Sequence, residues 1–434
     1  MYSRLYKNYV TTLLLVVYVF NQLDRLVFLV LMEPVKREFS LTDSQLGFVG
    51  GPALLLLYSF LGVPVARLAD RGQRIILMTV GIGLWSIIVA STAAVHQFWT
   101  LVLVRVGVGV GEAGFSAIAI SVISDYENGA ERARALSKFL LAYPIAGLMS
   151  YLLGGWVNQL YGWRPVFLIA GLPGILLALL VATTVREPLR RLPSGSKDPN
   201  QQPLRVVLST LWQRRSLRHL AIAQGLSNVA SNAMEWASVF FIRKHHMGTG
   251  ELGSWLAFTA GIGGCVGVWL SGFMVTRFAA KDARRRTSLL AVAALLVPPI
   301  ALFVLWYPSK NAALVGYLVL NLPVLFFIAP TAGLVQDLVG SNMRATMAAI
   351  FFLVQMILGG VLANQFVGTF SDVFTSFTGD STLGLCWSMT LGAMVSLWAA
   401  VHFWLAGRFV REDLAMSGSN EQSPLSLEHA DVPI

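Results

Sequence analysis

The stretch GVPVARLADRGQR, residues 62–74, joins two apolar segments of the chain through an arginine-rich loop. A second stretch of equal length, GFMVTRFAAKDAR at residues 272–284, lies 210 positions later and also follows an apolar segment. A loop that recurs at one long interval indicates that the chain contains two copies of a larger structural unit. The identical positions are Gly62, Val65, Arg67, Ala69 and Arg74, which correspond to Gly272, Val275, Arg277, Ala279 and Arg284.

The composition places the chain in a membrane. Of its 434 residues, 56% are apolar and only 12% are charged. A soluble protein of this length needs more charged residues to cover its surface. Apolar stretches of about 20 residues, the length of a membrane-spanning helix, also recur along the whole sequence. We therefore interpret the chain as a multi-pass membrane protein and not as a soluble protein with several buried helices.

Twelve segments have the length and pattern of membrane-spanning helices, six before and six after a polar linker. The predicted fold is an all-α integral membrane fold of two pseudo-symmetric six-helix bundles. The first six segments cover about residues 8–32, 42–66, 74–94, 97–124, 134–158 and 163–185, and the second six cover about 217–243, 251–277, 286–307, 311–338, 345–371 and 383–408. The parts are a first bundle at 1–188, a cytoplasmic linker at 189–216, a second bundle at 217–411 and a cytoplasmic tail at 412–434, which we expect to be disordered.

The distribution of charge predicts the orientation in the membrane. The net charge of +10 would by itself also fit a protein that binds nucleic acid. However, 24 of the 32 lysine and arginine residues fall in the N-terminus, the tail and the loops of one side, as the positive-inside rule requires of cytoplasmic loops. We therefore expect no nucleic-acid partner and expect both termini in the cytoplasm. Short loops and the lack of a cleavable signal sequence favour a bacterial cytoplasmic (inner) membrane.

The cysteines and histidines give no sign of a metal or cofactor site. Cys265 and Cys386 both lie in apolar segments, so we interpret them as small core residues. The six histidines are scattered, and the sequence motifs of zinc hydrolases, serine hydrolases and nucleotide-binding loops are missing from the sequence. We expect no metal, no cofactor and no enzymatic activity.

Charged residues inside the predicted spans are the candidate functional residues, because an ionisable group is costly at bilayer depth. Asn21, Asp24 and Arg25 occupy positions i, i+3 and i+4 of the first span and form one polar stripe. Asp24 and Arg25 differ by about 100° around the helix, so each is free to bind a partner on another helix. In the fourth span, Arg105 and Glu112 are seven residues apart and share a face, about 10 Å from each other along the axis. Nearby glycines allow close helix approach or bending at this face; they are Gly107, Gly109, Gly111 and Gly114.

The seventh span repeats this pattern in the second half. Asn228, Asn232 and Glu235 follow the spacing i, i+4 and i+7. The interval of 210 residues places Glu235 at the position of Arg25, so a pair of these two residues across the halves is a hypothesis based on pseudo-symmetry. Alternatively, Glu235 lies near the external end of this span, where it is solvated and has no functional role.

The chemistry of these groups predicts proton and anion binding. Burial favours a neutral carboxylic acid and a nearby arginine favours the carboxylate, so Asp24 and Glu112 are the expected proton carriers. A guanidinium stays charged and binds phosphate with two parallel N–H groups. Arg25 and Arg105 are therefore expected to bind an anionic substrate, with Asn21, Asn232 and Glu235 completing the site. A purely structural role remains open: Arg105 would then hold a static ion pair, and Asp24 with Arg25 would serve folding or topology.

The loop at residues 62–74, its copy at 272–284 and the ERARAL loop at 131–136 resemble loops of the major facilitator superfamily. When the chain is shifted by 212 residues, ERARAL aligns with MRATMA, and Arg132 then corresponds to Arg344. The resemblance covers essentially all twelve spans and implies the fold of that superfamily. It also implies a cytoplasmic gate formed by Asp70, Arg71 and Arg74. The second copy has Ala280 where the first has Asp70, so a complete second gate is not implied.

Two shorter motifs resemble the Spinster family within this superfamily. They are N-x-x-D-R in the first span, with Asn21, Asp24 and Arg25, and R-x-x-x-G-x-G-E-A beginning at Arg105 and including Glu112. The resemblance implies proton-coupled transport of lysophospholipids or lipids of the sphingosine-phosphate type, by a monomer within the lipid bilayer. A proton-coupled transporter of small organic anions on the same fold is the alternative, and it predicts no benefit from a substrate tail.

Overall fold

The computed structural model describes residues 2–71, 73–188, 202–280, 282–340 and 342–421. All regular secondary structure in these ranges is helical. Eleven segments of this part of the chain are long and apolar enough to cross a membrane. The all-α fold expected from the sequence is therefore confirmed.

The first half supplies six membrane spans, three of which contain a break. The second span is α2 followed by α3, the fourth is α5 followed by α6, and the fifth is α7 followed by α8. The helices are α1 (Arg4–Phe39), α2 (Asp43–Gly50), α3 (Pro52–Arg71), α4 (Arg74–Ser91), α5 (Phe98–Glu112), α6 (Phe115–Tyr126), α7 (Gly129–Leu140), α8 (Ala142–Tyr161) and α9 (Trp163–Thr184), with a short 3₁₀ turn η1 (Thr92–Ala94) after α4.

The second half has the same order of spans and two π-helical segments, η2 (Thr259–Gly263) and η3 (Met356–Ala363). Its seventh span, formed by α11 and α12, is too polar to be among the eleven apolar candidates and completes the twelve by its position. The helices are α10 (Leu204–Gln213), α11 (Arg215–Met234), α12 (Ala237–His245), α13 (Thr249–Phe258), α14 (Gly264–Phe278), α15 (Ala283–Trp306), α16 (Lys310–Phe326), α17 (Ile328–Asp337), α18 (Arg344–Gln355), α19 (Asn364–Thr378) and α20 (Ser381–Glu421).

Both the linker and the tail, the latter expected to be disordered, contain helical residues. The linker contains α10, whose Val207 is buried against the second half, while residues 189–201 lie outside the described part of the chain. The prediction of a disordered tail from residue 412 is wrong for its first ten residues, because α20 continues to Glu421. Asp413 explains the longer helix: its carboxylate accepts hydrogen bonds from the Ser216 amide and hydroxyl at 2.8 and 2.5 Å, at the start of α11. Residues 422–434 lie outside the described residues.

Glycines shape the fourth span as expected. A Cβ at Gly109 would lie 2.2 Å from the Leu54 carbonyl oxygen, so only glycine permits the close approach of α5 to α3. Gly114, with a φ of 80°, adopts the left-handed conformation that separates α5 from α6. Glu112 is consequently the last residue of α5, directly before a break in the span.

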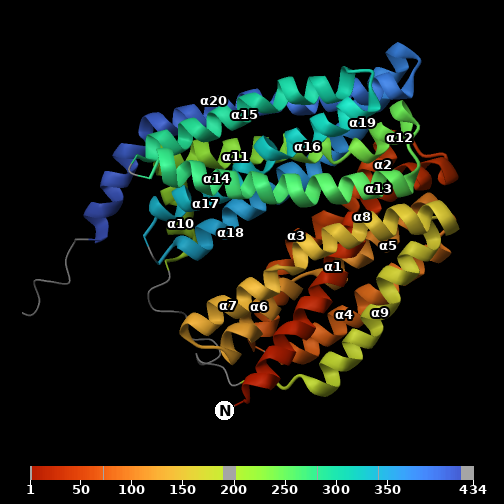
Figure 1. The fold of residues 1–434 in the computed structure, drawn as a ribbon. Helices are drawn as coiled ribbons and strands as arrows, with labels where there is room; N and C mark the ends of the chain where they lie inside the picture. Colours follow the sequence, from red (N-terminus) through yellow and green to blue (C-terminus); the bar gives the residue numbers. More distant parts are fainter. Residues whose placement is uncertain (1, 72, 189–201, 281, 341, 422–434) are drawn as a thin grey trace, which may run out of the picture.

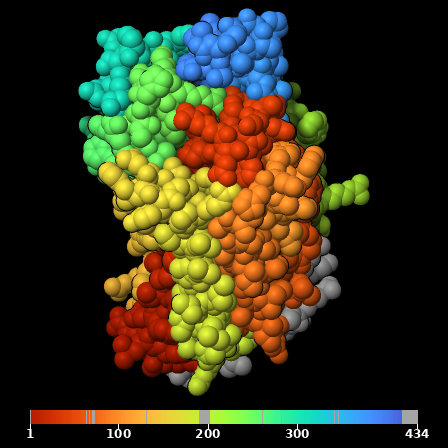
Figure 2. All heavy atoms as spheres, turned by 90° about the vertical axis from the view of Figure 1, so that its right-hand side faces the viewer, coloured from red at the N-terminus to blue at the C-terminus, as the bar shows by residue number. Residues whose placement is uncertain are grey.

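The two halves meet at one end of the molecule and diverge toward the other (Figure 1). We call the end where α1 begins and α20 stops the terminal end, and the end where α1 and α12 stop the far end. The halves pack through α2 against α19, α8 against α13, and α1 against α12, all in the far-end portions of their spans. Figure 2 views this far end and shows atoms of both halves packed against each other across it.

Candidate functional site

Two ion pairs join α1 to α5 in the interior of the first half. Arg25 donates from Nε and Nη2 to a single oxygen of Glu112, Oε2, at 2.8 and 2.6 Å. Arg105 donates from Nη1 to Asp24 Oδ2 at 3.0 Å. The adjacent residues Asp24 and Arg25 therefore do not neutralise each other, and each binds a partner on another helix, as their angular separation predicted.

Aromatic rings cover both guanidinium groups. The Arg25 guanidinium carbon lies 4.1 Å from the centre of the Tyr58 ring, and that of Arg105 lies 3.9 Å from the centre of the Phe28 ring. Such contacts favour a desolvated cation through the negative face of the ring. The rings come from α3 and α1, so the site draws on three spans of the first half.

The two ion pairs differ in the solvent exposure of their side chains. Asp24, Arg105 and Glu112 are at most 2% exposed, whereas the Arg25 side chain is 17% exposed. In this conformation the Asp24–Arg105 pair is sealed inside the first half, and a direct contact between Arg105 and a substrate stays a prediction. Arg25 is the residue of the four that a molecule between the halves reaches first.

The pairs leave several buried polar atoms without a hydrogen-bond partner among the described residues. Asp24 Oδ1 and Glu112 Oε1 are such acceptors, and Arg105 Nε, Arg105 Nη2 and Asn21 Nδ2 are such donors. Buried polar groups in proteins are nearly always bonded. The site therefore retains both proton-accepting and anion-binding capacity after its two ion pairs have formed.

Glu235 lies in the second half and does not pair with Arg25, whose hydrogen bonds go to Glu112. None of the ion pairs among the described residues includes Glu235, which follows the last residue of α11 at the break before α12. Its electrostatic neighbours are Tyr143, Tyr151 and Tyr317. Asn232 donates from its side chain to the Asn228 carbonyl, 3.0 Å away within the same helix.

Tyr143 links the two sets of residues and was not predicted. It is 56% exposed, near the start of α8, and is an electrostatic neighbour of both Arg25 and Glu235. The charged groups of the two halves therefore face the same region of the molecule. Tyr143 follows the break in the fifth span at Leu141, and the sequence pattern gave no sign of this break.

The expected cytoplasmic gate is only partly described. The side chains of Asp70 and Arg71 lie outside the described part of the structure. Arg74 is buried and donates to Asp125 at 2.6 Å and to Glu187 at 2.7 Å, both in its own half. In this conformation Arg74 therefore braces the first half and forms none of the described bonds to the second.

The second half contains a matching brace. Arg286 Nη1 donates to Asp337 Oδ2 at 2.7 Å, with the same atoms that join Arg74 to Asp125. Each member lies 212 positions after its counterpart, the offset at which ERARAL aligns with MRATMA. Nearby, the hydrogen bond from Arg411 lowers the pKa of Asp282 below its ordinary value. The two halves are thus structural copies at the terminal end, although Ala280 replaces the acid of the first loop.

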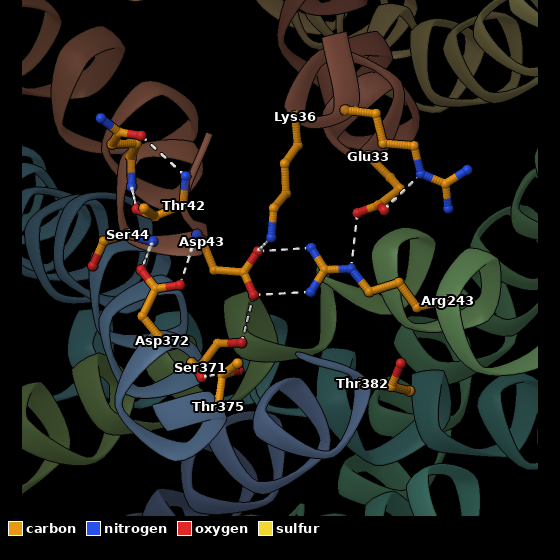
Figure 3. A network of polar contacts seen from close by, with 12 residues as sticks. Glu33, Lys36, Thr42, Asp43, Ser44, Arg243, Ser371, Asp372, Thr375 and Thr382 are labelled. Carbon is orange, nitrogen blue, oxygen red and sulfur yellow. Dashed lines mark hydrogen bonds and ion pairs between the residues drawn. The ribbon is translucent and has the colours of Figure 1, made fainter. Parts of the chain in front are cut away.

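The far end is closed by an ionic network that crosses the halves (Figure 3). Arg243 of α12 donates to both oxygens of Asp43 at 2.8 and 2.7 Å, and to Glu33 at 2.8 Å. Lys36 also binds Asp43, at 2.5 Å, and the Ser371 hydroxyl donates to it at 2.6 Å. The side chains of Arg243, Asp43 and Glu33 are 5%, 1% and 7% exposed, so this network is shielded from water.

Asp372 extends this network from α19. Its two carboxylate oxygens accept the backbone amides of Asp43 and Ser44 at 2.9 and 2.7 Å, at the first residues of α2. An anion at a helix N-terminus satisfies amides that have no partner within the helix. α19 of the second half therefore caps α2 of the first half.

The fold and these sites define a class of protein. The chain consists of two six-span halves that are structural copies. Buried charges lie in its interior, the far end is closed, and the halves diverge toward the terminal end. This is the architecture of a secondary transporter. A model of the Major Facilitator Superfamily matches residues 14–364, so the chain belongs to this superfamily. It is a transporter and not an enzyme.

Within the superfamily the chain is similar to proteins of the Spinster family. It is 25% identical over 424 residues to the "Sphingosine-1-phosphate transporter SPNS2" of Xenopus tropicalis, covering 91% of this chain and 80% of that protein. It is 28% identical over 404 residues to an "MFS-type efflux pump" of Mycolicibacterium smegmatis, covering 91% of each. A bacterial homolog of the human lysosomal transporter Spinster, solved in an inward-facing and unoccupied conformation, has the same fold, with a TM-score of 0.86 and 24% identity over 95% of this chain and 99% of that one.

Proposed function

We propose that the protein is a proton-coupled secondary transporter of amphipathic lipid-like anions, of the lysophospholipid or sphingosine-phosphate type. The observation that supports this proposal is the Arg25–Glu112 pair. Arg25 is the partly exposed cation of the site, and both of its bonding N–H groups are directed at one carboxylate oxygen. A phosphate group presents the same acceptor geometry to a guanidinium. A substrate phosphate is thus able to replace Glu112 as the partner of Arg25.

This exchange of partners couples substrate binding to proton uptake. A buried carboxylate that loses its cationic partner is stable only when it is protonated. When a substrate phosphate binds Arg25, Glu112 therefore takes up a proton. When the phosphate leaves, Glu112 releases the proton and the Arg25–Glu112 ion pair forms again. The sealed Asp24–Arg105 pair lies directly beside it and, in this mechanism, fixes α1 against α5 while Arg25 changes partner.

Alternating access follows from the arrangement of the halves. In the described conformation the far end is held closed by the network around Asp43, while the halves diverge toward the terminal end. We propose that the terminal end faces the cytoplasm of a bacterium, since the lysine and arginine residues gather there. The described state is then inward-facing. We propose a monomer as the transporting unit.

The name of one relative agrees with this substrate class, whereas a relative in Escherichia coli, named a probable L-galactonate transporter, fits the small-organic-anion alternative. The first of these relatives is named for sphingosine-1-phosphate, which combines a phosphate with a single apolar tail. A guanidinium beside a tyrosine ring fits such a phosphate.

The test is transport by purified protein in liposomes under an imposed pH gradient. We expect uptake of a labelled lysophospholipid that rises with the gradient and is inhibited by unlabelled lysolipids in order of increasing chain length. Inhibition that is indifferent to chain length, together with competition by tail-free sugar acids or aromatic acids, would instead support the small-organic-anion transporter.

A further inference from the structure

A basic cleft lies at the terminal end of the first half, away from the site of the proposed function. It has a volume of about 790 Å³ and separates the beginning of α1 from the loop after α6 and from α7. Lys7 and Arg25 are 18 residues apart on the same helix, or about 27 Å along its axis. The cleft is therefore a separate site. Its charged lining residues are Arg4, Lys7, Glu127, Glu131, Arg134 and Lys138.

The lining carries more positive than negative charge. Four cations, two from α1 and two from α7, face one cleft that holds two carboxylates. Lys7 is bound to Glu127 at 3.2 Å, and Lys138 donates to the Thr12 hydroxyl at 2.6 Å. Arg4 and Arg134, both exposed, take part in none of the ion pairs among the described residues. Like charges on opposite walls repel unless an anion lies between them.

The depth of the cleft in the membrane is marked by tyrosines. Tyr2 stacks on Tyr6 with ring centres 5.3 Å apart, and Tyr126 packs edge-on against Tyr2 at 4.9 Å. Tyr9 lies beside Tyr6 at 6.5 Å. Tyrosine rings concentrate where a membrane protein crosses the lipid headgroups. Tyr2 also lines the cleft, so we place the cations of the cleft at the level of the lipid phosphates.

We propose that this cleft binds the phosphate headgroup of an anionic glycerophospholipid of the surrounding membrane. Its volume, its surplus of cations and its depth all fit such a headgroup, since basic pockets between spans on the cytoplasmic side recruit anionic lipids. The bound lipid bridges α1 and α7. These helices already touch where the Tyr18 and Phe139 rings stack with centres 4.8 Å apart. The lipid therefore stabilises the folded first half by binding it.

The experiment uses the full-length purified protein in neutral detergent. Phosphatidylglycerol or phosphatidylcholine with identical acyl chains is added, and retained lipid is counted by native mass spectrometry while the melting temperature is measured. We expect retention of phosphatidylglycerol over phosphatidylcholine and a rise in melting temperature with phosphatidylglycerol alone. Equal retention of the two lipids would overturn the proposal.

Variants locate the binding site. In Arg4→Gln/Arg134→Gln we expect affinity for phosphatidylglycerol to fall roughly thirtyfold, since each surface cation contributes about fivefold. The charge-conserving Arg4→Lys/Arg134→Lys keeps most of the affinity and shows that folding is intact. The control Arg277→Gln/Arg408→Gln removes two exposed arginines outside the cleft and keeps full affinity. Unchanged binding in Arg4→Gln/Arg134→Gln would overturn the assignment.

A competition experiment distinguishes binding of the lipid headgroup from binding of free inorganic phosphate. Inorganic phosphate at the same concentration as the lipid should neither displace phosphatidylglycerol nor raise the melting temperature. Displacement by inorganic phosphate would show that the cleft recognises a soluble anion and would overturn the lipid assignment. Since every readout is binding or stability, these results do not depend on whether the protein transports lysolipids.

Discussion

Glu33 and Arg243, which are 210 positions apart in the sequence, form an ion pair of 2.8 Å across the two halves. This is the interval that relates the loop at residues 62–74 to its copy, so the two residues occupy equivalent positions in the repeats. Arg243 also holds both oxygens of Asp43. One buried cation is thus shared between two carboxylates of the opposite half, and the far end opens only when these bonds break.

Replacing Arg243 with glutamine is predicted to open the far end. The change leaves Glu33 and Asp43 buried with less positive charge, and breaking one side of a buried pair costs about 3–5 kcal/mol. Spin labels at Gln97 and Thr378, exposed far-end positions of the two halves, should report longer distances than in the unchanged protein. Arg164→Gln is the matched control, because Arg164 lies at the same end but binds Glu38 of its own half at 2.5 Å. Identical distance distributions in Arg243→Gln and the control would show that the network does not hold the halves together.

Glu112→Gln is predicted to abolish proton-driven transport while substrate binding is retained. Glutamine keeps the shape of the side chain and still accepts a hydrogen bond from Arg25, but it does not exchange a proton. Uptake into liposomes should become independent of the pH gradient, and substrate affinity should change by less than about tenfold. Gradient-dependent uptake at the normal rate would remove Glu112 from the mechanism.

Substitutions of Arg25 and Arg105 are predicted to have different effects, on substrate binding and on stability respectively. Arg25→Ala removes charged hydrogen bonds to the substrate, each about 1.5–3 kcal/mol, and should weaken substrate binding at least about tenfold. A binding titration with the lysophospholipid that transports best measures this loss. An Arg25→Ala protein that is folded and binds normally would contradict the proposed site.

For Arg105 the predicted effect is on stability. Arg105→Gln leaves Asp24 buried without its cation and should lower the free energy of unfolding by about 3–5 kcal/mol. The double change Asp24→Asn/Arg105→Gln should restore part of this loss, because no uncompensated charge remains. Thermal unfolding in detergent of the two single variants and the double variant measures the coupling energy. Additive losses would show that the pair contributes nothing as a pair.

Gly109→Ala is predicted to disrupt the first half. The new Cβ would lie 2.2 Å from the Leu54 carbonyl oxygen, so α5 and α3 must separate, at a cost of about 1–3 kcal/mol. Gly272→Ala is the control, since nothing lies within 4 Å of its Cβ position and alanine is the better helix former. The fraction of monodisperse protein on size exclusion should fall for Gly109→Ala and stay constant or rise for Gly272→Ala.

The sequence predicted the fold and the residues of the central site, but not how those residues pair. Spacing placed Asp24 and Arg25 about 100° apart and put Arg105 and Glu112 on one face, since both follow from the geometry of a single helix. Which acid meets which arginine depends on the relative rotation of two helices, which a single-chain pattern does not contain. The burial of Arg105 against Phe28 could not be predicted for the same reason, because it is a tertiary property.

The far-end network was missed for a different reason. Glu33, Asp43 and Arg243 lie at the ends of spans, where charged residues usually face water, so hydropathy gives no reason to select them. The repeat interval contained the missing information: applied to Arg25 it predicted a pair with Glu235, and applied eight residues later it relates Glu33 to Arg243. Only the packing of the halves shows which of these equivalent positions come into contact.

The polarity of the seventh span has a consequence for biogenesis. The segment made of α11 and α12 is less apolar than the other spans, so its own partitioning from the translocon into lipid is weak. In the folded protein α11 packs extensively against α20, the twelfth span, which is synthesised well after α11. We therefore expect stable integration of the seventh segment to require α20, and truncation before α20 should leave the seventh segment outside the bilayer core.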